Sequence, residues 1–232
     1  MIHIGLHVLP PILALNLYKA HKRSYNMNKH ERKVSHMSEI TSTNACLVII
    51  DMVNGFIHEG PMADASIKNI IVNIEELIKS FHQNHQPIIA FLDKHPENAK
   101  EFTAFVPHCV ANTSESEWVE ELLPYQNDVL FFEKNSVNGF LAPDFQQWFE
   151  IAPLYQQYVI TGCVSDICVL QFALTLQAYI HQHNLDATVT VCEDAIATFD
   201  APFHPKDTYH TMAIAFMKQC GIHITTSKEI TL

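Results

Sequence analysis

Six short, mostly apolar runs follow one another along the chain from residue 44, each of a length typical of a β-strand. They lie at residues 46–50, 87–92, 129–132, 158–161, 188–192 and 222–225. Several of them lack the alternation of apolar and polar positions that a strand exposed on one face would show. Such strands are typical of parallel sheets that helices cover on both sides.

Apolar residues at helical spacing separate these runs. Between the first two, Ile70, Ile74 and Leu77 repeat at intervals of three or four residues and predict a helix over residues 67–81. Further helices are predicted at residues 117–123, 145–149, 168–181 and 209–219. The strict alternation of strands and helices predicts a three-layer α/β/α fold with a central parallel sheet of about six strands. No repeat or linker divides residues 44–232, which we interpret as one domain.

Residues 1–43 precede this pattern, and we interpret them as an N-terminal extension that is disordered or loosely helical. The apolar stretch at residues 2–17 has no positive charge before it, two adjacent prolines interrupt it, and no small-residue cleavage site follows. These features argue against a secretory signal peptide, and the stretch is also too short to span a bilayer. A translation start at Met27 or Met37 is an alternative hypothesis.

Charge is unevenly distributed along the chain. Residues 1–36 hold six of the 14 lysines and arginines, including both arginines, whereas residues 37–232 carry eight lysines against 24 acidic residues, a formal net charge of −16. So acidic a body repels phosphate backbones, which excludes nucleic acid as a partner. Without arginine it also lacks the bidentate clamp for a carboxylate or phosphate. We therefore expect a neutral small-molecule substrate and no membrane partner.

Cysteine usage bears on the compartment. The six cysteines are spread along the chain without a CxxC pair, at positions 46, 109, 163, 168, 192 and 220. This usage suits a reducing compartment better than a disulfide framework. We expect a cytoplasmic protein that forms a homo-oligomer.

Polar residues that could take part in catalysis or ligand binding lie where the predicted strands end. Asp51 ends the first strand, Asp93 and His95 follow the second, Lys134 follows the third, and the turn 166–168 follows the fourth. Ligands of parallel sheets bind outside the carboxyl ends of the strands. All these side chains should therefore lie on one edge of the sheet.

Cys168 lies where the fourth strand gives way to a helix. In the first turn of a helix a thiol meets unpaired backbone N–H groups and the positive end of the helix dipole, and both favour the thiolate. Lys134 would favour it further, and Asp51 could accept the proton. Taken singly, Asp51 could be a strand-end cap, Lys134 a surface charge and Cys168 an apolar filler.

The three residues together resemble the Asp-Lys-Cys triad of the isochorismatase-like cysteine hydrolases. The matching segments are IIDMVNGF around Asp51, FEKN around Lys134 and VSDICV around Cys168, and the resemblance covers residues 44–226. It implies that Cys168 is the nucleophile and that the backbone N–H groups of Val164 and Cys168 hold the oxyanion. It also implies a cis peptide bond between Cys163 and Val164.

A second group of residues offers ligands for a metal ion. Asp93, His95 and His108 carry carboxylate and imidazole groups of the kind that bind zinc, iron or manganese, and Glu101 could add a carboxylate directly or through water. In a chain with 15 histidines an accidental pairing is the alternative. The group resembles the metal site of the nicotinamidase branch of the same family, and zinc is the metal we expect.

The resemblance implies a metal-assisted amidohydrolase that converts nicotinamide, or a similar heteroaromatic carboxamide, to the acid and ammonia through a thioester. It further implies that Phe56 and Phe105 wall the aromatic ring, although both could be ordinary core residues. Isochorismate is disfavoured because it is a dicarboxylate. A metal-free cysteine hydrolase acting on a carbamoyl or ureido group, and a non-enzymatic binding protein on this fold, are the alternatives.

One segment and one residue depart from the nicotinamidase pattern, and two histidines fall outside it. The segment after Lys134 reads NSVNGF, without the aromatic residue that usually follows within a few positions, so the pocket is expected to be altered there. Ser165 stands where threonine is usual, which should be harmless. His204 and His210 are in a loop and helix that could cap the pocket, and we interpret them as surface histidines.

Overall fold

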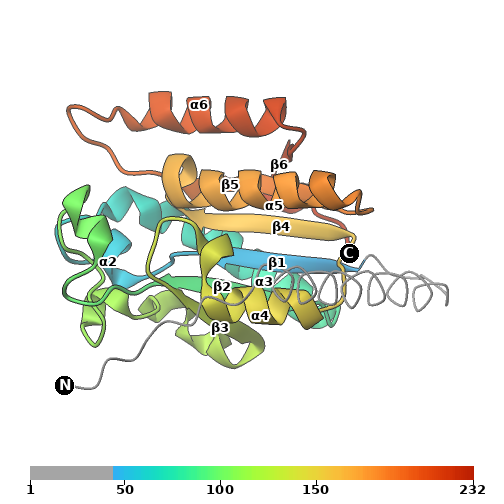
Figure 1. Ribbon diagram of the computed structural model, residues 1–232, viewed down its shortest axis with the longest axis horizontal. Helices are drawn as coiled ribbons and strands as arrows, with labels where there is room; N and C mark the ends of the chain where they lie inside the picture. Colours follow the sequence, from blue (N-terminus) through green and yellow to red (C-terminus); the bar gives the residue numbers. More distant parts are fainter. Residues whose placement is uncertain (1–43) are drawn as a thin grey trace, which may run out of the picture. The chain divides into compact units, whose positions relative to one another are not determined.

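Six strands form a single all-parallel sheet in the computed structural model, which describes residues 44–232. The expected N-terminal extension at residues 1–43 lies outside the described residues. The strands are β1 (Ala45–Ile50), β2 (Ile88–Asp93), β3 (Val129–Lys134), β4 (Gln157–Cys163), β5 (Thr188–Ala197) and β6 (His223–Thr225), in the order β3-β2-β1-β4-β5-β6. The predicted parallel sheet of six strands is therefore confirmed (Figure 1).

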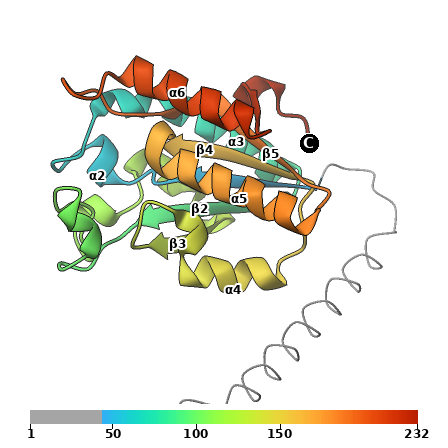
Figure 2. The same cartoon turned by 45° about the horizontal axis from the view of Figure 1, so that its top comes forward.

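Helices cover both faces of the sheet, as the three-layer prediction requires. Helix α3 (Ile71–Gln83) packs on one face, and α4 (Pro143–Ile151), α5 (Leu170–His183) and α6 (Lys206–Gln219) pack on the other (Figure 2). Strand β1 is buried throughout: Leu47 and Ile49 join the core under α3, whereas Val48 and Ile50 join the core under α5. This two-sided burial explains why the first apolar run shows no alternation.

One predicted helix differs from the structure. Residues 117–123 were expected to be helical, but the segment begins as extended chain, and a 3₁₀ helix then runs over Glu120–Asp128. The reason is that Trp118 forms an antiparallel bridge with Val53 and the Val119 N–H donates to the Met52 carbonyl oxygen at 3.1 Å. Tertiary pairing with the segment after β1 thus overrides the local helical preference.

The strand order fixes where a ligand can bind. Two strands follow β1 on one side of the sheet, and the chain then crosses to the other side of β1 to form β4. Ligands of open parallel sheets bind at such a reversal, outside the carboxyl ends of the strands. Short α2 (Asn54–Ile57) and a π-helical turn (Ser165–Val169) begin at this edge, directly after β1 and β4.

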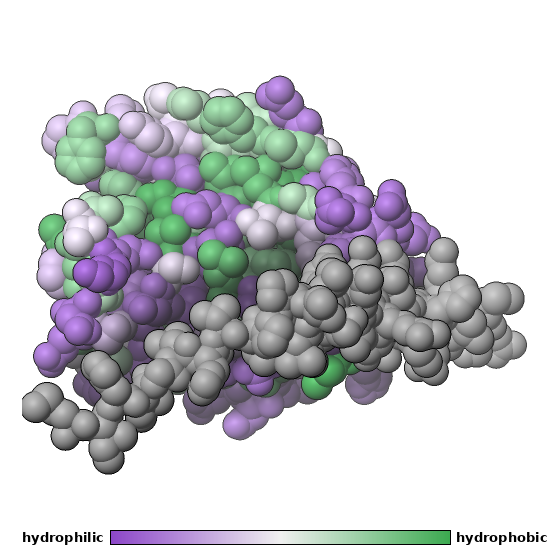
Figure 3. Space-filling view, viewed as in Figure 1, coloured by the Kyte–Doolittle hydropathy of each residue, from purple (hydrophilic) through white to green (hydrophobic). Residues whose placement is uncertain are grey.

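Apolar side chains gather over α5 and α6 on the face shown in Figure 3. On α6, Tyr209, Met212 and Phe216 are exposed on one side of the helix, whereas Ala213 and Met217 are buried against the sheet.

No helix among residues 44–232 combines the length and apolar character needed to cross a membrane.

Gly162 allows β4 to approach β1 closely just before the reversal point. It pairs with Ile50, its φ is +106°, and a Cβ atom at this position would collide with the backbone of Ile50. The close approach lets the Cys163 thiol donate to the carbonyl oxygen of Asp51 at 3.0 Å. Gly162 therefore joins the two strand ends that carry the candidate site.

Replacing Gly162 by alanine should lower the free energy of unfolding by about 3 kcal/mol or more, because backbone strain and a backbone collision add up. Gly221→Ala is the matched control, since Gly221 also has a positive φ (+87°) but its Cβ would meet no atom closer than 4.0 Å. We expect the control to cost about 1–2 kcal/mol. Urea unfolding of both variants measures the difference, and equal losses would contradict the close approach.

Candidate active site

Lys134 is the central charge of the site, and it is only 2% exposed. Its Nζ lies 2.9 Å from Asp51 Oδ2 and 2.7 Å from Asp93 Oδ1, and 3.9 Å from the Cys168 Sγ. Strand register explains the closeness, because Asp93 and Lys134 are paired residues at the ends of β2 and β3. The structure thus brings the three expected triad residues together and excludes the surface-charge alternative for Lys134.

Burial and charge act in opposite directions on the two carboxyl groups. Burial raises the pKa of Asp51 to about 7, opposed by Lys134 and assisted by Asp93. The pKa of Asp93 is held well below its usual range because Lys134 and the two histidines, His95 and His108, outweigh its burial. Lys134 is fully buried, yet the two carboxylates raise its pKa well above the ordinary value. The resting site therefore holds a lysine cation.

The Cys168 thiol is protonated at rest. Its side chain is 5% exposed, and burial raises its pKa well above the ordinary value, outweighing the opposite effect of Lys134. Lys134 favours the thiolate, as expected, but its ammonium group is shared with the carboxylates of Asp51 and Asp93, and burial outweighs its effect. A thiol in this setting becomes nucleophilic only as its proton leaves.

Asp51 is the group best placed to receive that proton. It is completely buried, its backbone has a left-handed φ of 53°, and neither carboxylate oxygen accepts a well-aligned hydrogen bond although Lys134 is close. A carboxylate so poorly solvated binds a proton more readily than an exposed one. The geometry therefore pairs a buried thiol with a buried base.

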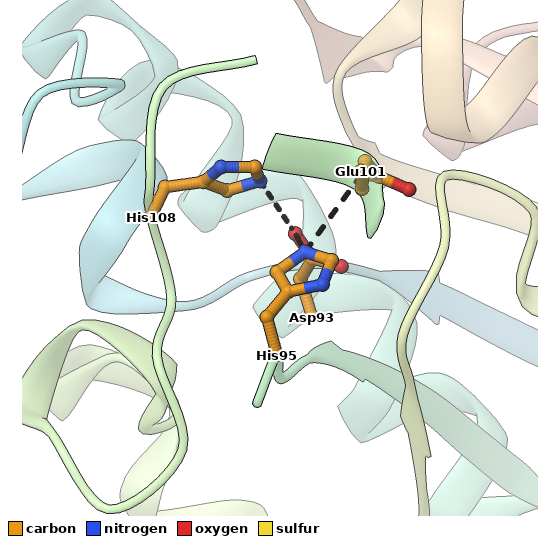
Figure 4. A group of neighbouring side chains, drawn as sticks. All are labelled: Asp93, His95, Glu101 and His108. Atoms are coloured by element: carbon orange, nitrogen blue, oxygen red, sulfur yellow. Dashed lines mark hydrogen bonds and ion pairs between the residues drawn. The ribbon is translucent and has the colours of Figure 1, made fainter. Parts of the chain in front are cut away.

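Four further side chains converge beside this group. Asp93, His95, Glu101 and His108 each offer a ligand atom, and these atoms all lie within 4.8 Å of one another (Figure 4). The Nε2 atoms of His95 and His108 lie 3.0 Å and 3.1 Å from Asp93 Oδ2, and Glu101 Oε1 lies 3.8 Å from His95 Nε2. The structure thus brings together the whole expected ligand set.

The outer nitrogens of both imidazoles are held in a way that suits metal binding. His95 Nδ1 lies 2.8 Å from Asn135 Oδ1, and His108 Nδ1 lies 2.8 Å from the Val106 carbonyl oxygen. Acceptors at Nδ1 fix the tautomer that leaves the Nε2 lone pairs free to ligate. The donor set and its surroundings therefore fit a divalent metal.

Two tight contacts hold the loop that carries His108. The Cys109 N–H donates to Glu115 Oε2 at 3.0 Å. A Cβ atom on Gly55 would lie 2.6 Å from Cys109 Sγ, so only glycine lets α2 approach this loop so closely. On the other side of the metal-ligand group, Glu101 Oε2 accepts the Val137 N–H at 2.9 Å, which ties the group to the segment after Lys134.

One pocket opens onto both groups of residues. Its lining includes Cys168, Asp93, Glu101 and His108 together with the expected wall residues Phe56 and Phe105 and the amide-bearing Val164. Sequence reasoning missed four further wall residues, Met62, Val137, Ile167 and Phe199. Apolar residues give no sign in the sequence of which ones face a pocket, although the NSVNGF departure did point at the segment of Val137.

His204 is a correction to the sequence interpretation. It was expected at the surface, but it is 6% exposed and its Nε2 lies 2.8 Å from Asp166 Oδ2. His210 is half-buried and its Nδ1 lies 3.0 Å from the Ser165 hydroxyl oxygen. Both histidines therefore contact the turn that carries Cys168, and that turn follows a cis peptide bond between Cys163 and Val164.

Comparison with known proteins agrees with this fold. Residues 45–229 match a family model described as an isochorismatase domain. The chain is similar to N-carbamoylsarcosine amidase from Thermoplasma acidophilum (23% identity, TM-score 0.68, 82% of this chain and 100% of that chain). It is also similar to a nicotinamidase from Bacillus subtilis (22% identity, TM-score 0.65, 79% and 99%).

A third similar structure is that of a protein in complex with zinc. The pyrazinamidase of Pyrococcus horikoshii, in complex with zinc, is 25% identical, with a TM-score of 0.65 over 79% of this chain and 99% of that chain. No curated protein matches the chain.

Metal binding tests the ligand group directly. After removal of bound metal with a chelator, the wild-type protein should bind one Zn²⁺ per chain, and His108→Ala should weaken binding by about 100-fold or more because a ligand is lost. Asn135→Leu, which removes only the acceptor behind His95, should weaken it by roughly 10- to 100-fold. His223→Ala, an exposed histidine on β6, is the control. Calorimetry that gives the same affinity for wild type and His108→Ala would exclude the site.

Proposed function

The chain belongs to the isochorismatase family, and we propose that it is a metal-assisted cysteine amidohydrolase that converts nicotinamide, or a similar heteroaromatic carboxamide, to the acid and ammonia. The observation that carries the proposal is the pocket shared by Cys168 and the metal-ligand group. A reactive thiol and a Lewis-acid site facing one cavity suit a substrate with an amide at one end and a ligating ring nitrogen at the other.

The charge of the pocket supports a neutral substrate. Its lining includes the carboxylates of Asp93 and Glu101 but no lysine or arginine, and Lys134 behind it is already paired with two carboxylates. Even a bound divalent metal would only balance the carboxylates already present, so the pocket offers no excess positive charge to a substrate carboxylate. This disfavours isochorismate and N-carbamoyl amino acids, and it favours an uncharged ring carboxamide.

The walls of the pocket support an aromatic substrate. Phe56, Phe105 and Phe199 contribute rings to the lining, and Val137 stands in the segment where nicotinamidases usually carry an aromatic residue. Aromatic side chains pack well against flat rings. The smaller valine leaves more room on one side, so we include pyrazinamide and other heteroaromatic carboxamides among the substrates.

Asp93, His95 and His108 would hold the metal, with Glu101 as a further ligand. When bound, a divalent metal supplies a Lewis acid that a ring nitrogen can ligate. Two imidazoles with carboxylates suit zinc, iron or manganese, and the zinc complex of the similar pyrazinamidase supports zinc. These four side chains would thereby orient the carboxamide toward Cys168.

In the first half of the reaction we propose that Asp51 takes the proton of Cys168 while the sulfur attacks the carboxamide carbon. A C–S bond forms, and the carbonyl oxygen becomes an oxyanion that accepts hydrogen bonds from the backbone N–H groups of Val164 and Cys168. Lys134 stays protonated and keeps Asp51 in place through the 2.9 Å ion pair. Asp51 then gives the proton to the amide nitrogen, the C–N bond breaks and ammonia leaves.

In the second half, water replaces ammonia. Asp51, again ionised, takes a proton from the water while the water oxygen attacks the thioester carbon. The C–S bond breaks, the proton returns to the Cys168 sulfur and the acid is released. The buried, poorly hydrogen-bonded carboxylate of Asp51 suits both steps, since it must bind and release a proton twice in each cycle.

Nicotinamide hydrolysis would give this protein a role in pyridine nucleotide salvage and NAD metabolism. All six cysteines of the chain are unpaired, five of them buried, which supports a reducing compartment such as the cytoplasm. The exposed apolar side of α6 supports a homo-oligomer.

Ammonia release tests the proposed function. Wild-type protein loaded with Zn²⁺ should release ammonia from nicotinamide, should lose this activity with a chelator, and should act poorly on N-carbamoylsarcosine. Cys168→Ala should reduce turnover by about 1,000-fold or more with an unchanged unfolding transition. Chelator-resistant hydrolysis of N-carbamoylsarcosine would instead favour a metal-free ureido hydrolase, and near-normal activity of Cys168→Ala would exclude the mechanism.

The pH dependence tests the role of Asp51. Since burial raises the pKa of Asp51 to about 7, its carboxylate form, which is the base, is lost as the pH falls below that value. We expect kcat/KM for nicotinamide to decline on the acid side with a midpoint at or below about 7, because a bound cation beside Asp93 opposes the effect of burial on Asp51. Asp51→Asn should show low activity without this decline, and a flat wild-type profile from about pH 5 to 8 would contradict the assignment.

A further inference from the structure

We propose that His204 is a positioning residue that, together with Asp166, holds the ring of Phe199 as a fixed wall of the substrate pocket. Phe199 lines the pocket, whereas His204 lies behind it. The inference rests on the proposed function, because it concerns how the pocket receives the ring of the substrate.

Burial in the segment that carries His204 is the reverse of what polarity predicts. The neighbouring Phe203 is 81% exposed, whereas His204 is 6% exposed. A phenylalanine would gain more from burial than a histidine, so the hydrophobic effect does not select this arrangement. Specific contacts of the imidazole must therefore account for the burial of His204.

The imidazole is stacked between two aromatic rings. Its centroid lies 4.0 Å from that of Phe199 at an interplanar angle of 12°, and 3.8 Å from that of Tyr209 at 24°. Phe199 lies just after the end of β5, and Tyr209 is in the first turn of α6. His204 therefore fills the space between the pocket wall and the helix, and without it the face of Phe199 turned away from the pocket would lose its contact.

Both imidazole nitrogens are engaged at the same time. Nδ1 lies 3.0 Å from the carbonyl oxygen of Phe199, and Nε2 lies 2.8 Å from Asp166 Oδ2. Both partners are oxygens, and the ring donates to both when each nitrogen carries a hydrogen atom. The backbone of Phe199 and its side chain are thus held by the same imidazole.

Asp166 connects this wall to the turn of the nucleophile. Its other carboxylate oxygen, Oδ1, accepts the Thr198 hydroxyl at 2.5 Å, and Asp166 lies in the same π-helical turn as Cys168. The residue between them, Ile167, also lines the pocket. Wall and nucleophile are therefore joined through one carboxylate.

Other bonds tether the two ends of the segment but leave its middle to His204. The Asp200 N–H donates to Asp64 Oδ2 at 2.9 Å, and the Lys206 N–H donates to Asp200 Oδ1 at 3.0 Å. Between them, the backbones of Ala201 and His204 bond only to each other, N–H to carbonyl oxygen in both directions. Loss of the imidazole should free Phe199 without unfolding the segment.

The decisive measurement is a double-mutant cycle on KM and kcat for nicotinamide. His204→Ala should raise KM about threefold to tenfold, the scale of one aromatic contact, and leave kcat within about twofold. Phe199→Leu should raise KM by a similar factor. The double variant should have the KM of Phe199→Leu alone, because His204 acts through that ring. His223→Ala is the control, and independent effects that multiply would overturn the proposal.

A readout without turnover separates this proposal from the proposed function. Protein labelled with 4-fluorophenylalanine gives a ¹⁹F signal for Phe199, assigned by its loss in Phe199→Leu. His204→Ala should shift and broaden that signal because the stacked ring is gone, and His204→Gln, which has no ring but keeps an amide donor, serves if the alanine variant does not fold. A wild type that releases no ammonia would refute the function alone, whereas an unchanged Phe199 signal would refute the positioning role.

Discussion

The structure around the candidate site depends on one buried cation, the ammonium group of Lys134, shared between the carboxylates of Asp51 and Asp93. All three side chains are almost completely buried. Removing either partner of a buried ion pair leaves the other charge without compensation in a poorly polarisable interior, which is far more costly than the pair itself. The three residues must therefore be kept together, and they tie the thiol at Cys168 to the metal-ligand group, since Asp93 belongs to both.

This arrangement is possible because the sheet is parallel and its order reverses beside β1. Parallel neighbours end at the same edge, so β1, β2 and β3 deliver Asp51, Asp93 and Lys134 to adjacent positions without long loops. The crossover to β4 then brings the turn of Cys168 to the other side of Asp51, where Gly162 permits the close approach. The positions are set by strand register, which is stiffer than any loop.

The sequence predicted the parts of the molecule that follow from local pattern. Apolar runs identified the strands, and polar residues directly after them identified the edge that carries Lys134 and the metal-ligand group. What it did not predict depends on contacts between distant segments: the extended chain at Trp118, and the pair formed by Asp166 and the buried His204. Histidine is common in this chain, and nothing local distinguishes the buried His204 from an exposed one, because its partners Phe199 and Asp166 meet it only in the folded state.

Charge balance gives a reason for a divalent ion at this site that is independent of any relative. With its side chains ionised, the site holds the three carboxylates of Asp51, Asp93 and Glu101 against the single ammonium of Lys134, a formal charge of −2 in a largely buried region. Uncompensated charge of this size is costly in a protein interior. Protonation of Asp51 would remove half of this negative charge, but it would also remove the base. A divalent cation would neutralise the charge and leave Asp51 ionised. By this argument the metal and the base support each other: positive charge beside Asp93 lowers the cost of ionising Asp51, and the carboxylates in turn strengthen the attraction for the cation.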